Sequence, residues 1–184
     1  MKLIILDRDG TINEDRDDYV KSADEWVPLP GALEAIARLN HAGWHVVVAT
    51  NQSGLGRGLF DMAALNAMHT KLNRLLATHG GRVDAVFFCP HAPDDACECR
   101  KPQDGLLRRA AADLGVDLRE AWMVGDILDD IEAGNRAGCR TVLVDRGHET
   151  EWRLASLRRP TATVRRLDEA AEVILDAVPR RAIA

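Results

Sequence analysis

Two carboxylates separated by one residue follow the first apolar run of the chain. Asp7 and Asp9 come directly after residues 3–6, and Gly10 and Thr11 follow them. At the carboxyl end of a buried parallel strand, side chains project into the crevice in which α/β proteins bind ligands. One carboxylate there could attack an electrophile while the other moves protons, and together they could hold a cation. An acidic turn without chemistry is the alternative, because Asp and Gly are common turn residues.

Polar side chains also follow two later apolar runs. Thr50 and Asn51 follow the second run, Asp126 and Asp130 follow the fourth, and Lys101 precedes a proline just before a predicted helix. The carboxyl ends of parallel strands lie at one edge of a sheet, so we expect these residues to converge with the first carboxylate pair.

Such a cluster suits a phosphoryl group. Several carboxylates repel one another unless a cation binds, and Mg²⁺ prefers oxygen ligands. Thr50 and Lys101 could bind the phosphoryl oxygens while Asp7 attacks phosphorus to form an aspartyl-phosphate. Asp9 could protonate the leaving oxygen and then deprotonate the attacking water. Each short motif is common by itself, so the prediction depends on their order and on their placement at strand ends.

Apolar runs alternate with amphipathic segments along the chain. We expect strands at residues 3–6, 46–49, 83–88, 121–124, 140–144 and 161–164. Helices are expected to begin at Gly31, Asp61, Asp104 and Asp168, the last reaching Val178, with a further helix ending at Gly138. Residues 148–156 are expected to form a helix or a loop. This alternation predicts an α/β fold, a Rossmann-like parallel sheet with helices on both faces, in one domain over residues 1–184.

Composition narrows the class of protein. The 184 residues carry a net charge of −5, with no basic run before the arginine-dotted tail, which argues against nucleic acid as a partner. No apolar run is long enough to span a membrane, and no signal peptide precedes the first predicted strand. We therefore expect a cytoplasmic protein with no membrane partner, and we expect it to act as a monomer.

The segment 89–101 carries a second candidate metal site. Its four possible ligands lie within eleven residues: Cys89, His91, Cys97 and Cys99. Three thiolates and one imidazole form a closed tetrahedral set for Zn²⁺, which predicts a structural site that stabilises a short polar loop. Free thiols with a surface histidine, or a disulfide from Cys89 to Cys97 or Cys99, are the alternatives, which a cytoplasmic compartment disfavours. The loop leads directly into Arg100 and Lys101, so zinc would fix two cations beside the phosphoryl site.

Four motifs resemble those of the haloacid dehalogenase superfamily. They are Asp7-Arg8-Asp9-Gly10-Thr11, Thr50-Asn51, Lys101-Pro102 and Gly125-Asp126-x-x-x-Asp130, and the resemblance runs from residue 2 to about residue 145. It implies that Asp7 is the nucleophile and Asp9 the general acid/base. The acid/base carboxylate implies a phosphatase rather than a dehalogenase, since only a phosphatase must protonate its leaving group.

The same resemblance implies the ligands of the site. Mg²⁺ would be held by Asp7, the backbone carbonyl of Asp9, and Asp126. Asp130 would support them, and Asp129 could share that role. Thr50 and Lys101 would bind the phosphate.

The resemblance also implies an open site without a cap domain. The interval after the first strand is too short for a cap, and the later one holds only the zinc-binding loop, so the loops 14–26, 53–58 and 90–100 must set specificity. The zinc-binding loop, with Tyr19-Val20 and residues 50–54, resembles the subfamily of heptose bisphosphate and histidinol-phosphate phosphatases.

This subfamily implies a phosphorylated sugar substrate. The reaction would remove the C7 phosphate of D-glycero-D-manno-heptose 1,7-bisphosphate in nucleotide-heptose biosynthesis, which feeds lipopolysaccharide or glycoprotein assembly. Asn51, Ser53, Arg57 and Arg100 would contact the substrate, although Arg57 is equally well explained as a solvated loop cation. Histidinol phosphate or another small phosphomonoester is the alternative substrate. A receiver-like binding module and a vestigial site fit less well, because of the zinc-binding loop and the complete set of side chains.

Overall fold

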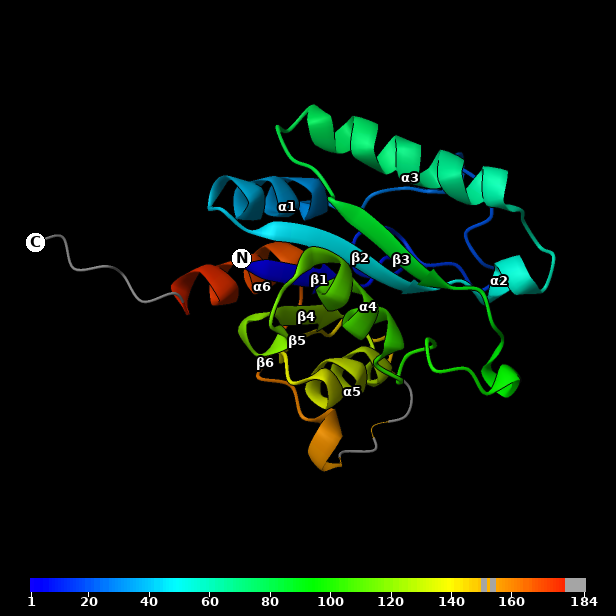
Figure 1. The fold of residues 1–184 in the computed structure, drawn as a ribbon. Coiled ribbons are helices and arrows are strands. Elements are labelled where there is room, and N and C mark those ends of the chain that lie inside the picture. The colour runs from blue at the N-terminus through cyan, green and yellow to red at the C-terminus, as the bar shows by residue number, and fades with distance from the viewer. Residues whose placement is uncertain (150–151, 153–154, 178–184) are drawn as a thin grey trace, which may run out of the picture.

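Six parallel strands form the sheet against which the helices pack (Figure 1). The computed structural model describes residues 1–149, 152 and 155–177. The strands are β1 (Leu3–Leu6), β2 (His45–Asn51), β3 (Ala85–Cys89), β4 (Trp122–Gly125), β5 (Arg140–Val144) and β6 (Ala162–Val164). Their order across the sheet is β3-β2-β1-β4-β5-β6. The predicted Rossmann-like parallel sheet is confirmed, and β1 lies near its middle.

Helices cover both faces of this sheet. The α-helices are α1 (Ala32–His41), α2 (Ser53–Gly56), α3 (Met62–Ala77), α4 (Gly105–Leu114), α5 (Leu128–Ala137) and α6 (Leu167–Asp176). Three short 3₁₀ helices are η1 (Pro93–Asp95), η2 (Leu118–Glu120) and η3 (Ser156–Arg158). Helices α1, α3 and α6 pack on one face, and α4 and α5 pack on the other (Figure 1).

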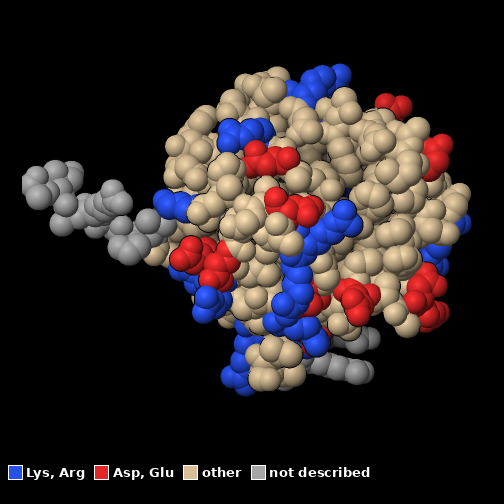
Figure 2. Space-filling view, in the orientation of Figure 1, with Lys and Arg blue, Asp and Glu red and all other residues tan. Residues whose placement is uncertain are grey.

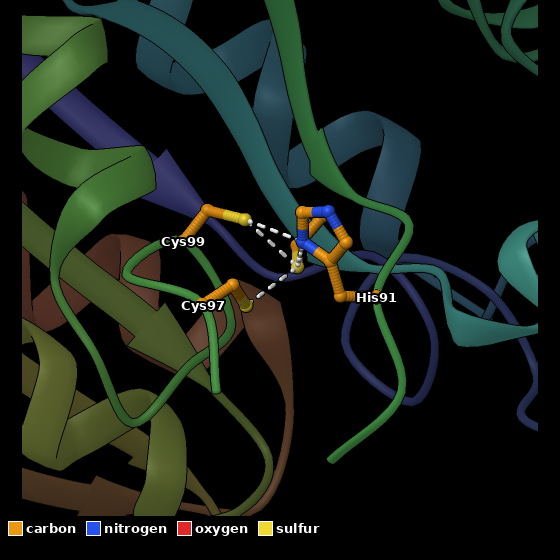
Figure 3. Close-up of side chains that lie close together, drawn as sticks. His91, Cys97 and Cys99 are labelled. Atoms are coloured by element: carbon orange, nitrogen blue, oxygen red, sulfur yellow. Dashed lines mark hydrogen bonds between the residues drawn. The ribbon is translucent and has the colours of Figure 1, made fainter. Parts of the chain in front are cut away.

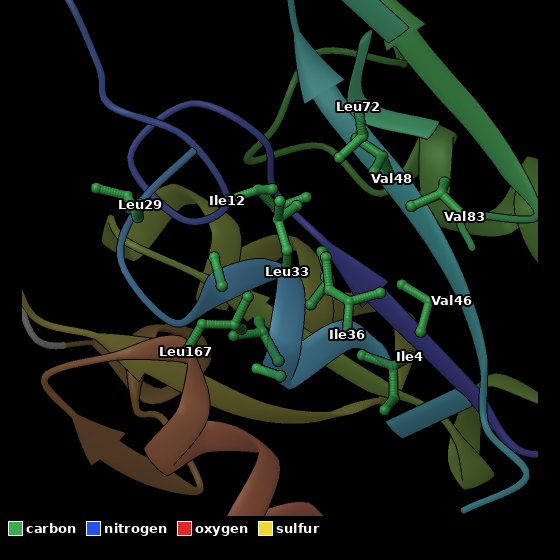
Figure 4. Close-up of a cluster of buried hydrophobic side chains, with 14 of the residues drawn as sticks. Ile4, Ile12, Leu29, Leu33, Ile36, Val46, Val48, Leu72, Val83 and Leu167 are labelled. Atoms are coloured by element: carbon green, nitrogen blue, oxygen red, sulfur yellow. The ribbon is translucent and has the colours of Figure 1, made fainter. Parts of the chain in front are cut away.

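Alternating side chains of the strands build the two halves of the core. In β1, Ile4 and Leu6 belong to the core beneath α1, α3 and α6, whereas Leu3 and Ile5 face α4 and α5. This alternation follows from the two-residue period of a strand, and apolar residues on both faces are expected when helices cover both. Figure 4 shows the first half, with Ile36 of α1 packed among the strand residues.

The residues at the N-cap positions of the helices match the predicted ones only in part. Asp61 caps α3, since its carboxylate accepts a hydrogen bond from the Ala64 N–H at 2.8 Å. Asp104 occupies the N-cap position of α4, but its side chain makes no capping bond. The prediction that Asp168 caps the last helix is wrong, because Arg166 holds that position. Asp168 lies in the first turn, where a negative charge still favours the helix dipole.

Strand β2 is longer than predicted. Thr50 and Asn51 were expected to follow it, yet both pair with β3, opposite Phe88 and Cys89. These two polar residues are therefore the last residues of β2, where the strand still pairs with β3. Residues 148–156 are described only in part, and Val178 lies outside the described residues.

The connections at the carboxyl edge of the sheet are loops. The loop after β1 is closed at its base, where the Glu14 N–H donates to the Val27 carbonyl at 2.8 Å. Lys71 of α3 holds it from the side and donates to the carbonyls of Ala23 and Trp26, both at 2.7 Å. The connection after β3, residues 90–104, contains only η1. Neither connection forms a cap domain, as predicted.

Charged side chains of both signs are mixed over the surface. On the face shown in Figure 2, Lys and Arg side chains lie among Asp and Glu side chains. Ion pairs between near neighbours include Arg108 with Asp104 at 2.7 Å and Arg119 with Asp117 at 2.6 Å. Within the described part of the chain, none of the helices has the length and apolar character needed to cross a bilayer.

Candidate functional site

Three carboxylates meet at the carboxyl edge of the sheet. Asp7 follows β1, Asp126 follows β4, and Asp130 lies one turn into α5. All three are buried, and each offers an oxygen within 4.8 Å of the others. Direct pairing of β1 with β4 brings them together, because the Asp7 N–H donates to the Val124 carbonyl at 2.9 Å. Gly125 leaves the room they need, since a side chain there would collide with Asp130.

One buried ammonium group lies within this cluster. Lys101 Nζ is 2.7 Å from Asp7 Oδ1 and 2.6 Å from Asp130 Oδ1. Its backbone is fixed by the Asn51 amide, which donates to the Lys101 carbonyl at 3.1 Å and accepts from the Lys101 N–H at 3.0 Å. Asn51 therefore positions Lys101 by holding its main chain.

The cluster has more negative than positive charge. Burial, followed by the charges of Asp7 and Asp130, raises the pKa of Asp126 to about 10. Burial and the Asp7 charge likewise raise the pKa of Asp130 to about 7. Burial disfavours the Lys101 ammonium, but Asp130 and Asp7 outweigh it and raise the pKa of Lys101. Three oxygen ligands in one buried place with an unbalanced negative charge fit a hard divalent cation such as Mg²⁺.

Asp9 lies beside the cluster and has partners of its own. Arg8 donates from Nε to Oδ1 at 2.9 Å and from Nη2 to Oδ2 at 3.1 Å. Asn13 donates to Oδ1 and Gln52 to Oδ2, each at 2.9 Å. Burial opposes ionisation, but the Arg8 charge and these hydrogen bonds outweigh it and lower the pKa of Asp9. Gln52 also donates to the Thr50 hydroxyl at 2.9 Å, so it links Asp9 to β2.

A cavity of about 280 Å³ opens over these residues. Its floor is formed by Asp7, Asp9, Thr50, Asn51, Lys101, Asp126 and Asp130. Its walls come from three loops: Asp15, Arg16, Asp17, Tyr19 and Val20 from the first, Gln52 and Ser53 from the second, and Arg100 from the third, with Ile127. The three loops expected to set specificity therefore all reach the cavity.

Gly10 and His148 shape the side of the cluster that faces Asp126. Gly10 has a φ of 86°, and a side chain there would collide with the Asp126 carboxylate. His148 Nδ1 lies 2.6 Å from Asp126 Oδ2, and the imidazole remains one-third exposed. A histidine from the segment after β5 therefore contacts a carboxylate that follows β4.

The second candidate metal site is a compact group of sulfur and nitrogen atoms (Figure 3). Cys99 Sγ is 2.9 Å from Cys89 Sγ and 3.3 Å from His91 Nδ1, and Cys89 Sγ is 3.6 Å from Cys97 Sγ. All are free cysteines, so the disulfide alternative is wrong. Three sulfurs and one imidazole nitrogen within 4.8 Å of one another fit a tetrahedral zinc ion.

The thiols of Cys89 and Cys97 differ in their pKa. Burial and the neighbouring Cys99 raise the pKa of Cys89 to about 12. At Cys97 burial also opposes ionisation, but the Arg100 N–H and the neighbouring thiols outweigh it and lower the pKa to about 6. The backbone of Arg100 thus contacts the sulfur cluster while its side chain lines the cavity.

Comparison with known proteins identifies the family. A family model described as HAD-hydrolase-like matches residues 98–170. The D-glycero-beta-D-manno-heptose-1,7-bisphosphate 7-phosphatase of Bordetella bronchiseptica is 60% identical over 148 residues, covering 80% of this chain and 83% of that protein. The protein of the same name from Pseudomonas aeruginosa is 55% identical over 145 residues, covering 79% and 82%. The chain belongs to the haloacid dehalogenase superfamily. Within it, the chain is a member of the family formed by these heptose bisphosphate phosphatases.

A solved structure of that family has the same architecture. The crystal structure of D,D-heptose 1,7-bisphosphate phosphatase from B. bronchiseptica, complexed with magnesium and phosphate, superimposes with a TM-score of 0.89 at 53% identity. The match covers 96% of this chain and 99% of that one.

The structure brings most of the predicted site residues of this family member together. The floor and walls of the cavity hold Asp7, Asp9, Thr50, Asn51, Ser53, Arg100, Lys101, Asp126 and Asp130. Arg57 caps the end of α2 and does not line the cavity. Asp129 is not among the three grouped carboxylates and pairs with Arg158 at 3.1 Å.

Sequence reasoning missed several residues at the site. Gln52 stands in the motif Thr50-Asn51-Gln52, but nothing in its spacing indicates that it joins Thr50 to Asp9. Arg8 was visible only as the residue between the two aspartates. His148 and His69 lie in no motif, and only the fold brings them to Asp126 and Arg8.

Proposed function

We propose that this chain hydrolyses the C7 phosphate of D-glycero-β-D-manno-heptose 1,7-bisphosphate, which yields heptose 1-phosphate and inorganic phosphate. The observation that carries the proposal is a pair of aspartates, Asp7 and Asp9, on the floor of a cavity that also presents Lys101. Support for the substrate comes from relatives up to 60% identical that are named as heptose bisphosphate phosphatases.

In the first step, Asp7 acts as the nucleophile. A carboxylate oxygen of Asp7 bonds to phosphorus as the bond from phosphorus to the C7 oxygen breaks, and Asp9 gives its proton to that leaving oxygen. Lys101 and Thr50 bind the phosphoryl oxygens, whose charge they stabilise during transfer. Lys101 is suited to this role because it already contacts Asp7.

In the second step, water releases the phosphate. The Asp9 carboxylate takes a proton from water as its oxygen bonds to phosphorus and the bond to Asp7 breaks. The products are inorganic phosphate and the original forms of both aspartates, so the cycle balances. Four hydrogen bonds keep Asp9 in place for both transfers. They also lower its pKa, so Asp9 takes up the proton for the first step when the negatively charged phosphoryl group is bound beside it.

Magnesium is the proposed ion of the carboxylate cluster. Asp7, the backbone carbonyl of Asp9, and Asp126 would hold it, and Asp130 would support them. When bound, Mg²⁺ neutralises negative charge on the phosphoryl oxygens and on the carboxylates. The excess of buried acids over cations supports this assignment.

Zinc is the proposed ion of the cysteine-histidine group, held by Cys89, His91, Cys97 and Cys99. Its role would be structural, because four protein ligands leave no position for water or substrate. By fixing Cys97 it also fixes Arg100, whose N–H lies 3.4 Å from the Cys97 sulfur. Arg100 would then contact the second phosphate, for which its planar guanidinium is well suited. Ser53 would contact the sugar.

Phosphate release from purified protein with Mg²⁺ tests the proposal. We expect kcat/KM for the β-heptose bisphosphate to exceed that for the α anomer and for histidinol phosphate by at least about tenfold. One phosphate should be released per bisphosphate, from C7. Faster turnover of histidinol phosphate, or release from C1, would contradict the proposal.

We also propose that residues 1–184 act as one domain and as a cytoplasmic monomer. Every side chain in the proposed reaction comes from a single chain, so a monomer is sufficient. An active species that elutes at the 20.2 kDa expected for one chain would support this.

A further inference from the structure

Arg8 is a fully buried cation that takes no part in the proposed reaction. Its side chain is 0% exposed, and two of its nitrogens hold the two carboxylate oxygens of Asp9 at 2.9 and 3.1 Å. A guanidinium bound to both oxygens fixes the plane of a carboxylate as well as its position. The orientation of Arg8 therefore helps to set the orientation of the Asp9 carboxylate.

The other end of Arg8 reaches helix α3. Arg8 Nη1 lies 3.2 Å from His69 Nε2 and 3.6 Å from Met68 Sδ. A guanidinium can only donate hydrogen bonds, so His69 Nε2 must accept and the imidazole must be neutral. Burial and the Arg8 charge lower the pKa of His69 to about 4, which keeps it neutral.

We propose that His69 is a positioning residue for Asp9 and acts through Arg8. The inference rests on the proposed function, in which Asp9 moves both protons. Without His69, Arg8 Nη1 would keep only its contact with the Met68 sulfur, a weak acceptor, and would leave one buried N–H unsatisfied. Asn13 and Gln52 would still hold Asp9, so the loss of His69 displaces the carboxylate without releasing it.

The two chemical steps depend on Asp9 to different degrees. A sugar oxygen needs the Asp9 proton to leave, whereas p-nitrophenolate is stable as an anion and leaves without one. Attack by water needs Asp9 as a base whichever leaving group has departed. A displaced Asp9 should therefore slow the second step for both substrates but slow the first step only for the sugar.

The experiment is rapid mixing of p-nitrophenyl phosphate and Mg²⁺ with the wild-type protein, His69→Leu and His69→Gln. In His69→Leu we expect the first turnover of p-nitrophenolate to stay within about twofold of wild type, and steady-state turnover to fall about tenfold. Steady-state turnover of the heptose bisphosphate should fall at least as much. His69→Gln offers Arg8 an amide oxygen and should recover most of the loss.

Asp9→Asn is the reference variant and should show the same split in more extreme form. Equal slowing of both phases in His69→Leu, or no slowing of either, would overturn the inference while the proposed function stands. An equal loss in His69→Gln and His69→Leu would also overturn it, because an acceptor would then be irrelevant. If the wild-type protein releases phosphate from neither substrate, the proposed function fails and this inference fails with it.

Discussion

The carboxylate cluster and the cysteine-histidine group are assembled in opposite ways. Asp7, Asp126 and Asp130 come from two strand ends and a helix, and only the pairing of β1 with β4 makes them neighbours. The four ligands from Cys89 to Cys99 lie within eleven residues of one another. The first site therefore depends on the fold of the whole sheet, and the second depends on one loop.

The two sites also differ in what holds them without a metal. The carboxylate cluster contains the buried cation Lys101, which bridges two of its acids. The sulfur cluster is held by weak contacts between thiols and one imidazole, in a connection whose only regular element is η1. We infer that the carboxylate site keeps its shape without Mg²⁺, whereas the loop needs zinc to keep its own.

Replacing the nucleophile should give the largest effect on activity. We expect Asp7→Asn to lower kcat by at least about 10³-fold, since an amide cannot replace the carboxylate oxygen that attacks phosphorus. The melting temperature should not fall, because one of three mutually repelling acids is removed. Asp129→Asn is the matched control, as Asp129 pairs with Arg158 instead. Substantial turnover by Asp7→Asn would exclude Asp7 as the nucleophile.

Removing the buried cation should damage both stability and activity. Lys101→Met leaves Asp7 and Asp130 without their partner, and loss of one member of a buried ion pair costs about 3–5 kcal/mol. Activity should fall at least about 100-fold as the phosphoryl oxygens lose a positive charge. Denaturant unfolding and phosphate release measure the two effects.

A second substitution separates these effects. In Lys101→Met with Asp130→Asn, one of the two uncompensated charges is removed, so stability should recover in part while activity does not. Recovery of both would mean that Lys101 only balances charge and has no role in catalysis.

Zinc loss should lower stability more than catalysis. We expect Cys99→Ala to lose bound zinc and to melt at least about 5 °C lower, while kcat falls less than about tenfold and KM rises as Arg100 is released. Cys139→Ala is the control, because Cys139 is buried outside the cluster and should leave the zinc content unchanged. Absence of zinc from the wild-type protein, by elemental analysis, would refute the site.

One site lies within a single loop and the other is assembled by the sheet. This difference explains which residues of each site could be predicted from the sequence. The grouping of Cys89, His91, Cys97 and Cys99 was predictable from spacing alone, because a local set needs no fold. Asp7, Asp126 and Lys101 required the further rule that parallel strands end at one edge of a sheet. That rule sufficed because apolar runs mark the strands clearly.

Contacts that neither spacing nor strand order encodes were not predictable. The amide of Asn51 was expected to contact substrate, and nothing in the sequence indicated that it also holds the backbone of Lys101. Its spacing after β2 places it at the edge of the sheet but does not say which neighbour its side chain reaches. Arg57 is the opposite case: it was expected to contact substrate, but it lies at the C-terminal end of α2 and does not line the cavity.

The smallest expected effect concerns His148, which joins the carboxylate cluster through a single contact. His148 Nδ1 lies 2.6 Å from Asp126 Oδ2, where an Nδ1–H would orient the carboxylate toward the ion. Such supporting hydrogen bonds affect metal affinity by about 10–100-fold, and partial exposure places His148 at the low end. We expect His148→Ala to weaken Mg²⁺ binding about tenfold by titration calorimetry, with little change in kcat at saturating Mg²⁺. His148→Asn keeps a donor near the same position and should bind Mg²⁺ more tightly than His148→Ala. Equal affinities in the two variants would show that His148 does not orient Asp126. The close packing of Gly10 against the Asp126 carboxylate would then be sufficient to orient it.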